Sequence, residues 1–199
     1  QDLIVHSNFG DGDTMTITVT DDITAIPTVV GIENVNFNLE AFSTPNGTTD
    51  TFDVAADNIR SSSFMLDLTE TGSTISKASV TGVKSGSTVE FSDDFTDVDV
   101  QGVDNSSLTI NTNGTTLTVT AAAGSVDGVT VNAANDLTVD GSANDGSFTA
   151  DVDGDLDITA VTATSAVLTA TGAITATSLA AATDITATAG ASSTLVAMG

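Results

Sequence analysis

The sequence predicts an all-β protein, a parallel β-solenoid (β-helix) with about 19 residues per coil. Three observations predict it: a repeat of nearly constant length in the second half, two strand-like stretches in each repeat, and a composition of small side chains. Because connections between parallel strands prefer one hand, we expect the coils to be right-handed.

The repeat begins at Asn113, from which the chain divides into four segments of nearly equal length and a shorter fifth. In each full segment, apolar residues stand at every second position of two stretches, the period of a strand with one buried face. Aligned, the segments place Leu117 beside Leu137 and Phe148 beside Leu168. Asp-Gly sequences, which favour turns, separate several of these strands.

The composition favours a narrow interior. The chain is 40% hydrophobic, with eight Phe and no Trp or Tyr. Small and β-branched side chains suit a regular stack of strands better than a thick core. An antiparallel β-sandwich would also give many short strands at regular spacing. We favour the solenoid because alternate strands match each other in length and turn chemistry, which a sandwich does not require.

We expect two regions, residues 1–30 and residues 31–199. The first is an N-terminal β segment with a Gly/Asp-rich turn. The second is the solenoid, continuing to an uncapped C-terminal end. Its first strand lies in VVGIENVNFNL (residues 29–39), where Val35, Phe37 and Leu39 alternate and can share the inward face, while Glu33 suits a turn.

The charge is strongly acidic, with 27 acidic residues, three basic residues and a net charge of -24. Such a chain repels phosphate, so we expect no binding to nucleic acid or to anionic membrane surfaces. No apolar run is long enough to cross a bilayer, so no segment is expected to span a membrane. The acidic residues form either a solvated surface or a set of carboxylates that need divalent cations to neutralise them.

The candidate cofactor is Ca²⁺, which prefers hard oxygen ligands. In the segment DVDGDLD, carboxylates alternate around a turn at Gly154, and the coil register places Asp136 one coil earlier. A Gly/Asp-rich turn near the N-terminus adds a weaker candidate. The alternative is a solvated acidic turn without metal. The candidate ligands are Asp151, Asp153, Asp155, Asp157, Asp136, Asp11 and Asp13.

We expect no enzymatic activity and no catalytic residues. The chain has no Cys, and its single His, His6, lies in a polar stretch with no partner in the sequence pattern. Carboxylates are plentiful, but no Trp or Tyr offers a surface on which a sugar could stack.

The order of segments resembles that of surface-layer and RTX-type (repeat-in-toxin) secreted β-solenoid proteins of Gram-negative bacteria. In those proteins a Gly/Asp-rich turn precedes a strand, and a segment with a Gly-aliphatic-Glu start opens Thr/Ala/Val-rich coils. The chain departs from the pattern because it has one degenerate turn rather than a tandem array, which weakens any interpretation as a toxin or protease. The matching residues are Gly10, Gly12, Asp13 and Met15, then Gly31, Ile32, Glu33, Val35 and Phe37.

The resemblance implies a non-enzymatic structural protein, assisted by Ca²⁺, that associates with identical subunits into an extracellular layer or filament on the bacterial surface. Cell-surface polysaccharide is a further candidate partner. A bacteriophage fibre or an adhesin stalk is the alternative, with the virion as its location. Because Gln1 is not an initiator Met and no signal-peptide pattern follows it, we expect a processed chain or part of a longer one.

Overall fold

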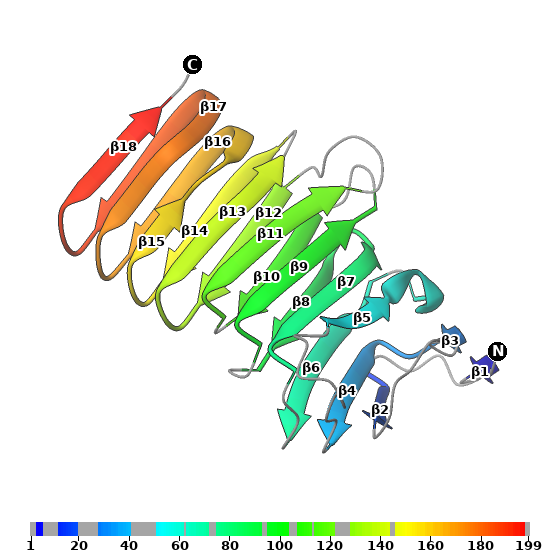
Figure 1. Ribbon diagram of the computed structural model, residues 1–199. Coiled ribbons are helices and arrows are strands. Elements are labelled where there is room, and N and C mark those ends of the chain that lie inside the picture. The colour runs from blue at the N-terminus through cyan, green and yellow to red at the C-terminus, as the bar shows by residue number, and fades with distance from the viewer. Residues whose placement is uncertain are drawn as a thin grey trace.

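The computed structural model describes residues 3–5, 12–19, 28–40, 51–61, 63–71, 75–92, 95–103, 107–112, 114–121, 128–143 and 146–197. These residues form strands β1 to β18 and one short 3₁₀ helix, η1 (Ala56–Asn58), with no α-helix among them. The strands stack side by side into an elongated rod, with the N-terminal and C-terminal strands at opposite ends (Figure 1). The predicted all-β parallel solenoid is confirmed.

Two walls of parallel strands form the rod. We call them the even wall and the odd wall. The even wall contains β2 (Thr14–Val19), β4 (Asn34–Glu40), β6 (Met65–Thr71), β8 (Ser87–Phe91), β10 (Ser107–Thr112), β12 (Gly128–Ala133), β14 (Ser147–Val152) and most of β16 (Val161–Ala170). The odd wall contains β5 (Thr51–Ala55), β7 (Lys77–Val83), β9 (Asp97–Gly102), β11 (Thr116–Ala121), β13 (Leu137–Ala143) and β15 (Leu156–Ile158).

The last coils join the two walls through long strands. β17 (Ile174–Ala189) pairs with β15 at its start and with β16 along the rest of its length, so one strand crosses from the odd wall to the even wall. β18 (Ser193–Ala197) pairs with β17. At the opposite end, β1 (Leu3–Val5) and β3 (Thr28–Val30) form a separate two-stranded parallel sheet.

Every strand pair among the described residues is parallel, which excludes the antiparallel sandwich. β11 pairs in parallel with β9 on one side and with β13 on the other. It does not pair with β12, its neighbour in sequence, as a hairpin would require. Each strand therefore hydrogen-bonds to the equivalent strand of the next coil, the arrangement expected when alternate strands match.

Alternation along the strands builds the core. In β8 and β14 every second residue is buried, and the residues between them face outward. Residues of both walls meet in one apolar cluster. Ser87 and Thr112 are the buried polar residues in the described part of the chain. Inward positions hold mainly Val, Leu, Ile and Ala with a few Phe, whereas many outward positions hold Thr, Asn and Asp.

The longest coil of the even wall lies near the N-terminal end, between β4 and β6. Asn34 pairs with Met65 near the N-terminal end, whereas Phe148 pairs with Ala166 further along, a much smaller step in the sequence. One column of inward residues becomes smaller in the same direction, from Phe37, Leu68 and Phe91 to Ala133, Val152 and Ala170. This column therefore carries its aromatic residues in the N-terminal coils, whereas other columns keep large side chains such as Phe148 and Leu168 further along the rod.

The average coil length is about 20 residues over about 7 turns, close to the predicted period. Two predicted alignments are nevertheless wrong. Leu117 pairs with Val139 rather than Leu137, because the β11–β13 coil is longer and contains a register shift. Phe148 pairs with Ala166 rather than Leu168, because its coil is shorter than average. A constant period conceals these differences.

The first strand of the large sheet lies earlier than residue 31. β2 pairs in parallel with β4, so parallel stacking begins at Thr14. Val35, Phe37 and Leu39 are buried, as their alternation predicted. The Glu33 carboxylate accepts a hydrogen bond from the Asp13 backbone N–H at 3.3 Å, so Glu33 joins the ends of two successive coils at a turn.

A polar groove on the even wall

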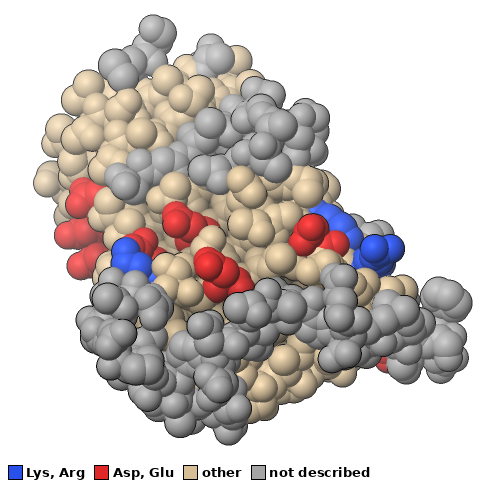
Figure 2. All heavy atoms as spheres, turned by 45° about the vertical axis from the view of Figure 1, so that its right-hand side comes forward, with Lys and Arg blue, Asp and Glu red and all other residues tan. Residues whose placement is uncertain are grey.

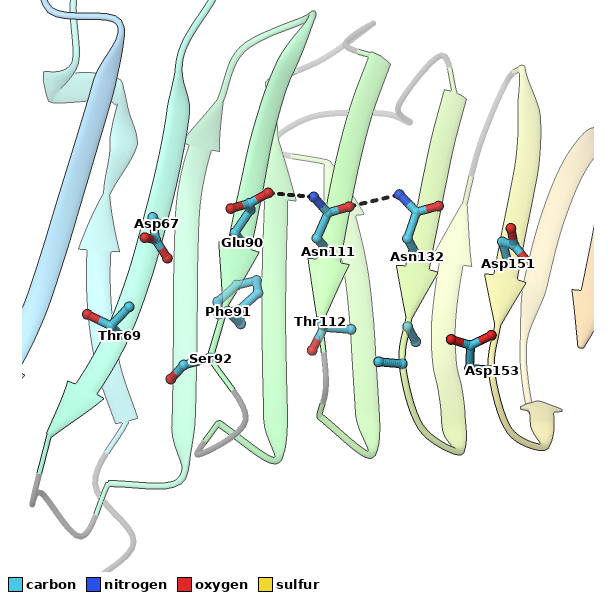
Figure 3. A pocket seen from close by; sticks show the side chains of 12 residues that line it. Asp67, Thr69, Glu90, Phe91, Ser92, Asn111, Thr112, Asn132, Asp151 and Asp153 are labelled. Atoms are coloured by element: carbon cyan, nitrogen blue, oxygen red, sulfur yellow. Dashed lines mark hydrogen bonds between the residues drawn. The ribbon is translucent and has the colours of Figure 1, made fainter. Parts of the chain in front are cut away.

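A polar groove of about 450 Å³ lies on the outer face of the even wall. It crosses β6, β8, β10, β12 and β14, so consecutive coils contribute its lining. Carboxylates, carboxamides and hydroxyl groups dominate the lining, and none of the described lining residues is basic. Figure 3 shows how these side chains project from adjacent strands.

One outward residue per strand forms a continuous row along the groove, which we call the acid–amide row. Parallel register aligns its five members across the strands: Asp67, Glu90, Asn111, Asn132 and Asp151. Each member lies beside its neighbours because the side chains of aligned residues in parallel strands project from the same face. The row is thus a direct product of coil stacking.

The middle of the row is a directed chain of hydrogen bonds. Asn132 Nδ2 donates to Asn111 Oδ1 at 2.8 Å, and Asn111 Nδ2 donates to Glu90 Oε1 at 2.8 Å (Figure 3). Stacked amides commonly pair in this way along parallel strands. Since both amides donate toward Glu90, the chain has an acceptor at each end: the Glu90 carboxylate and the Asn132 carbonyl oxygen.

Each end of this chain faces another acceptor. Asp67 lies beside Glu90, and Asp151 lies beside Asn132. Ionised carboxylates cannot donate hydrogen bonds, so neither neighbour can satisfy the end of the chain. The pKa of Asp67 is raised by partial burial and, to a smaller extent, by the negative charge of Glu90. We call the two places the Asp67–Glu90 junction and the Asn132–Asp151 junction.

The groove floor is partly apolar. Phe91, Ala133 and Ala134 contribute carbon atoms beside the acid–amide row. Thr112 also lies on the floor, and its Oγ1 accepts a hydrogen bond from the Gly114 N–H at 2.9 Å.

Ser92 differs from Thr112. Its Oγ exposes less than 1 Å² and has no hydrogen-bond partner in the described part of the chain. Ser92 also lines the groove. A buried hydroxyl without a partner carries a desolvation cost.

The residues predicted as Ca²⁺ ligands in DVDGDLD are divided between different surfaces. Asp151 and Asp153 line the groove on the even wall. Asp157 is exposed on β15 of the odd wall. Consecutive outward residues separate in this way because the chain turns from one wall to the other at Gly154.

The other two acids of this region hold the turn. Asp136 Oδ1 accepts from the Asp155 backbone N–H at 2.8 Å, and Asp155 Oδ1 accepts from the Ala173 backbone N–H at 2.6 Å. They thus form a ladder in which each coil caps the turn of the next. Asp13 lies beside the Glu33 carboxylate, and Asp11 is outside the described residues.

Among the described residues, no three Asp, Glu or His side chains come together as ligands of one metal ion would. Calcium binding at the seven predicted positions therefore stays a prediction. The acid–amide row itself was not predicted. The equal spacing of Glu90, Asn111 and Asn132, which recur once per coil, was the signal that could have identified it.

Both lysines are engaged by their surroundings. On the face shown in Figure 2, blue basic side chains lie next to red acidic ones. Lys77 pairs with Asp97, which raises the pKa of Lys77. Lys84 donates to the backbone carbonyl oxygens of Ile59 and Ser61, and burial together with nearby Arg60 lowers its pKa. Both lysines are thus engaged away from the groove, whose described lining residues include no basic side chain.

No family model, curated protein or solved structure matches this chain. In the described residues, no helix has the length and apolar character needed to cross a membrane.

Proposed function

We propose that the protein is a non-enzymatic structural component of an extracellular, self-assembling surface layer or filament on the bacterial surface, stabilised by Ca²⁺. The observation that carries this proposal is the uninterrupted parallel stack from β2 to β18. A stack of this kind is a stiff, repetitive spacer in which each coil contacts its neighbours alone.

The edge of the last coil supports self-association. β18 pairs with β17, and no strand of the described residues covers its other edge. Two apolar side chains of β18 are unusually exposed to solvent: Leu195 is 40% exposed and Val196 is 51% exposed. An open parallel edge can pair with a further strand, supplied either by more of the same chain or by another subunit.

The charge supports a role for divalent cations. With a net charge of -24, neighbouring rods repel one another unless cations screen or bridge their carboxylates. Ca²⁺ binds carboxylate and carbonyl oxygens, which the outer faces provide in abundance. We infer that Ca²⁺ joins rods through carboxylates of adjacent copies, with cell-surface polysaccharide as a further candidate partner.

Negative-stain electron microscopy of the purified chain, with Ca²⁺ and then with EGTA, tests this proposal. We expect ordered layers or filaments with Ca²⁺ that disperse when EGTA removes it. Mg²⁺ at the same ionic strength is the control for simple screening, because it keeps its own water shell more strongly. Isolated rods that are indifferent to EGTA would contradict the proposal and favour a bacteriophage fibre or an adhesin stalk.

A further inference from the structure

We propose that successive copies of this chain stack head to tail, with the outer edge of β17 in one copy pairing in parallel with β2 of the next. This inference rests on the proposed self-assembling function and names the partner of the open end as a second copy. It is carried by the strand edges, the exposed core residues and the low charge at the two ends of the rod.

The first step is the pair of strand edges. The second half of β17, residues 184–189, pairs with β16 on one side, and no strand in the described part of the chain pairs with its other side. Among the described strands, β2 pairs with β4 alone. The two edges belong to the even wall and lie at opposite ends of the rod (Figure 1). A second copy displaced along the rod would therefore bring them together with their strands parallel.

The second step is the odd-wall strand at the same end. β18 extends the odd wall, because it pairs with the first half of β17. Leu195 follows Ile158 and Ala176 in one inward column, yet those two residues are fully buried and Leu195 is 40% exposed. No even-wall strand of the described residues lies opposite β18. In the proposed stack, β2 of the next copy occupies that place and covers Leu195.

The third step is the apolar surface of both end strands. Six partly buried apolar residues pack against the core of the described chain, and five of them belong to β2 or β17. Because each coil of a solenoid is covered by its neighbours, a core residue stays partly exposed where a neighbouring coil is missing. The five are Met15, Ile17, Ala181, Ile185 and Ala189.

The fourth step is the register. The even wall is built of straight columns with one residue per strand, and one outward column runs from Thr14 through Thr109 to Thr186. The next outward column begins at Thr16 and ends at Thr188 in the same way. If each column continues across the contact, Thr186 faces Thr14 and Thr188 faces Thr16.

This register also combines inward side chains of different size. Met15 of one copy meets Ala187 of the other, and Ile17 meets Ala189. All four occupy inward positions of the even wall. A large side chain opposite a small one fills the interior without crowding, as layers of a packed core do.

Charge favours contact at the ends over contact along the flanks. β2 contains no charged residue, and Asp184 is the only charged residue between Ile158 and Ala197. Most of the acidic residues that give the net charge of -24 therefore lie elsewhere, where they repel a neighbouring rod. The core of a protein interface is depleted of charged residues in the same way.

Disulfide trapping tests the contact, because the chain has no Cys of its own. Thr16→Cys protein is mixed with Thr188→Cys protein in EGTA, oxidised and analysed on a non-reducing gel. Aligned Cα atoms of neighbouring strands lie about 4.8 Å apart, within the roughly 4.4–6.8 Å that a disulfide spans. We expect a covalent dimer in the mixture and little dimer in either protein alone.

A second pair of exposed threonines on the same two strands controls for random collision. Thr18→Cys and Thr186→Cys also place thiols at exposed positions, but the proposed register separates them by four residues, or about 13 Å. The aligned pair should give several times more dimer. Equal yields from the two pairs, or no dimer from either, would overturn the proposal. Dimer from Thr188→Cys protein alone would overturn it in favour of contact between like ends.

A charged side chain in the end layer gives a further test. Ala187 is inward-facing but exposed, so Ala187→Lys in the Thr188→Cys protein adds an inward-pointing charge that opposes stacking. Val167→Lys adds the same charge at an exposed outward position on β16. Circular dichroism establishes that both variants are folded. We expect Ala187→Lys to abolish the cross-link and Val167→Lys to retain it, and the same result in both variants would overturn the proposal.

The cross-link and the layer test can fail separately. Oxidation in EGTA traps even short-lived contacts between two ends, whereas the layer requires Ca²⁺ between flanks. Layers in Ca²⁺ without the aligned cross-link would overturn the end contact alone. The aligned cross-link without layers would support the end contact and contradict the Ca²⁺-stabilised layer.

Discussion

Two glycines at the turn between the walls show how single residues set the geometry of the stack. A Cβ atom on Gly154 would lie 2.1 Å from Asp136 Oδ1, and one on Gly172 would lie 2.0 Å from Asp155 Oδ1. In both cases the carboxylate that occupies this space accepts a backbone hydrogen bond of the next coil. Because glycine has no side chain, each of these positions leaves room for the carboxylate of the preceding coil that caps the turn.

This arrangement predicts that Gly172→Ala is destabilising. The added methyl group must displace the Asp155 carboxylate from the Ala173 N–H, so we expect a loss of about 1–3 kcal/mol in the free energy of unfolding, the usual cost of overpacking. Chemical denaturation followed by circular dichroism measures it.

The double variant Asp155→Ala/Gly172→Ala separates the collision from other effects. Asp155→Ala removes the oxygen nearest to the added Cβ, while the Gly154 carbonyl oxygen remains 2.9 Å from it. The double variant should therefore lose less stability than the sum of the two single variants. If the stability losses of the two single variants simply add in the double variant, the collision with Asp155 is not the cause of the loss in Gly172→Ala. That result would contradict the proposed collision.

At the scale of elements, the strands and their parallel pairing could be predicted because burial imposes a period of two along each strand. The lengths of individual coils could not. Extra residues are absorbed at corners and register shifts, which leave the alternation intact, so Leu117 faces Val139 although the average period points to Leu137.

The groove escaped prediction for a related reason. The acids of DVDGDLD are close in sequence, but the fold places Asp151 on the even wall and Asp157 on the odd wall. The acid–amide row joins residues one coil apart, such as Asn111 and Asn132. Predicting it requires the register of every coil between Asp67 and Asp151, not the average period.

The position of Phe148 in β14 predicts a large loss of stability when its aromatic side chain is removed. Phe148 is fully buried and aligned between Val129 and Ala166. We expect Phe148→Ala to lower the free energy of unfolding by about 3–5 kcal/mol, because the small neighbouring side chains cannot fill the cavity. Denaturant unfolding measures this change.

Val167 provides the comparison for Phe148, since it lies on the adjacent strand β16 but points outward and is 43% exposed. Val167→Ala should change stability by less than about 0.5 kcal/mol. Similar losses in the two variants would mean that the interior of the rod does not carry its stability.

At the scale of the whole molecule, the dominant feature is like charge. The net charge of -24 destabilises the compact state through self-repulsion, which dissolved salt screens. We therefore expect the melting temperature to rise as NaCl is increased from low to physiological concentration. Differential scanning calorimetry at a series of salt concentrations measures the slope.

A triple variant, Asp53→Asn/Asp99→Asn/Asp157→Asn, isolates the electrostatic contribution. All three residues are exposed on the odd wall, so their replacement removes charge without disturbing the core. The variant should show a shallower dependence of melting temperature on salt. An unchanged slope would attribute the salt effect to something other than repulsion.

Coil length has a consequence for how such a chain can change in size. Near the N-terminal end successive coils of the even wall differ in length, so removing or duplicating one would bring unequal coils together. Between β12 and β17 successive coils are nearly equal in length, although their inward side chains range from Ala166 to Phe148. We therefore expect insertions and deletions of whole coils to be tolerated best there, which makes the C-terminal half the part of the rod whose length evolution or design can adjust.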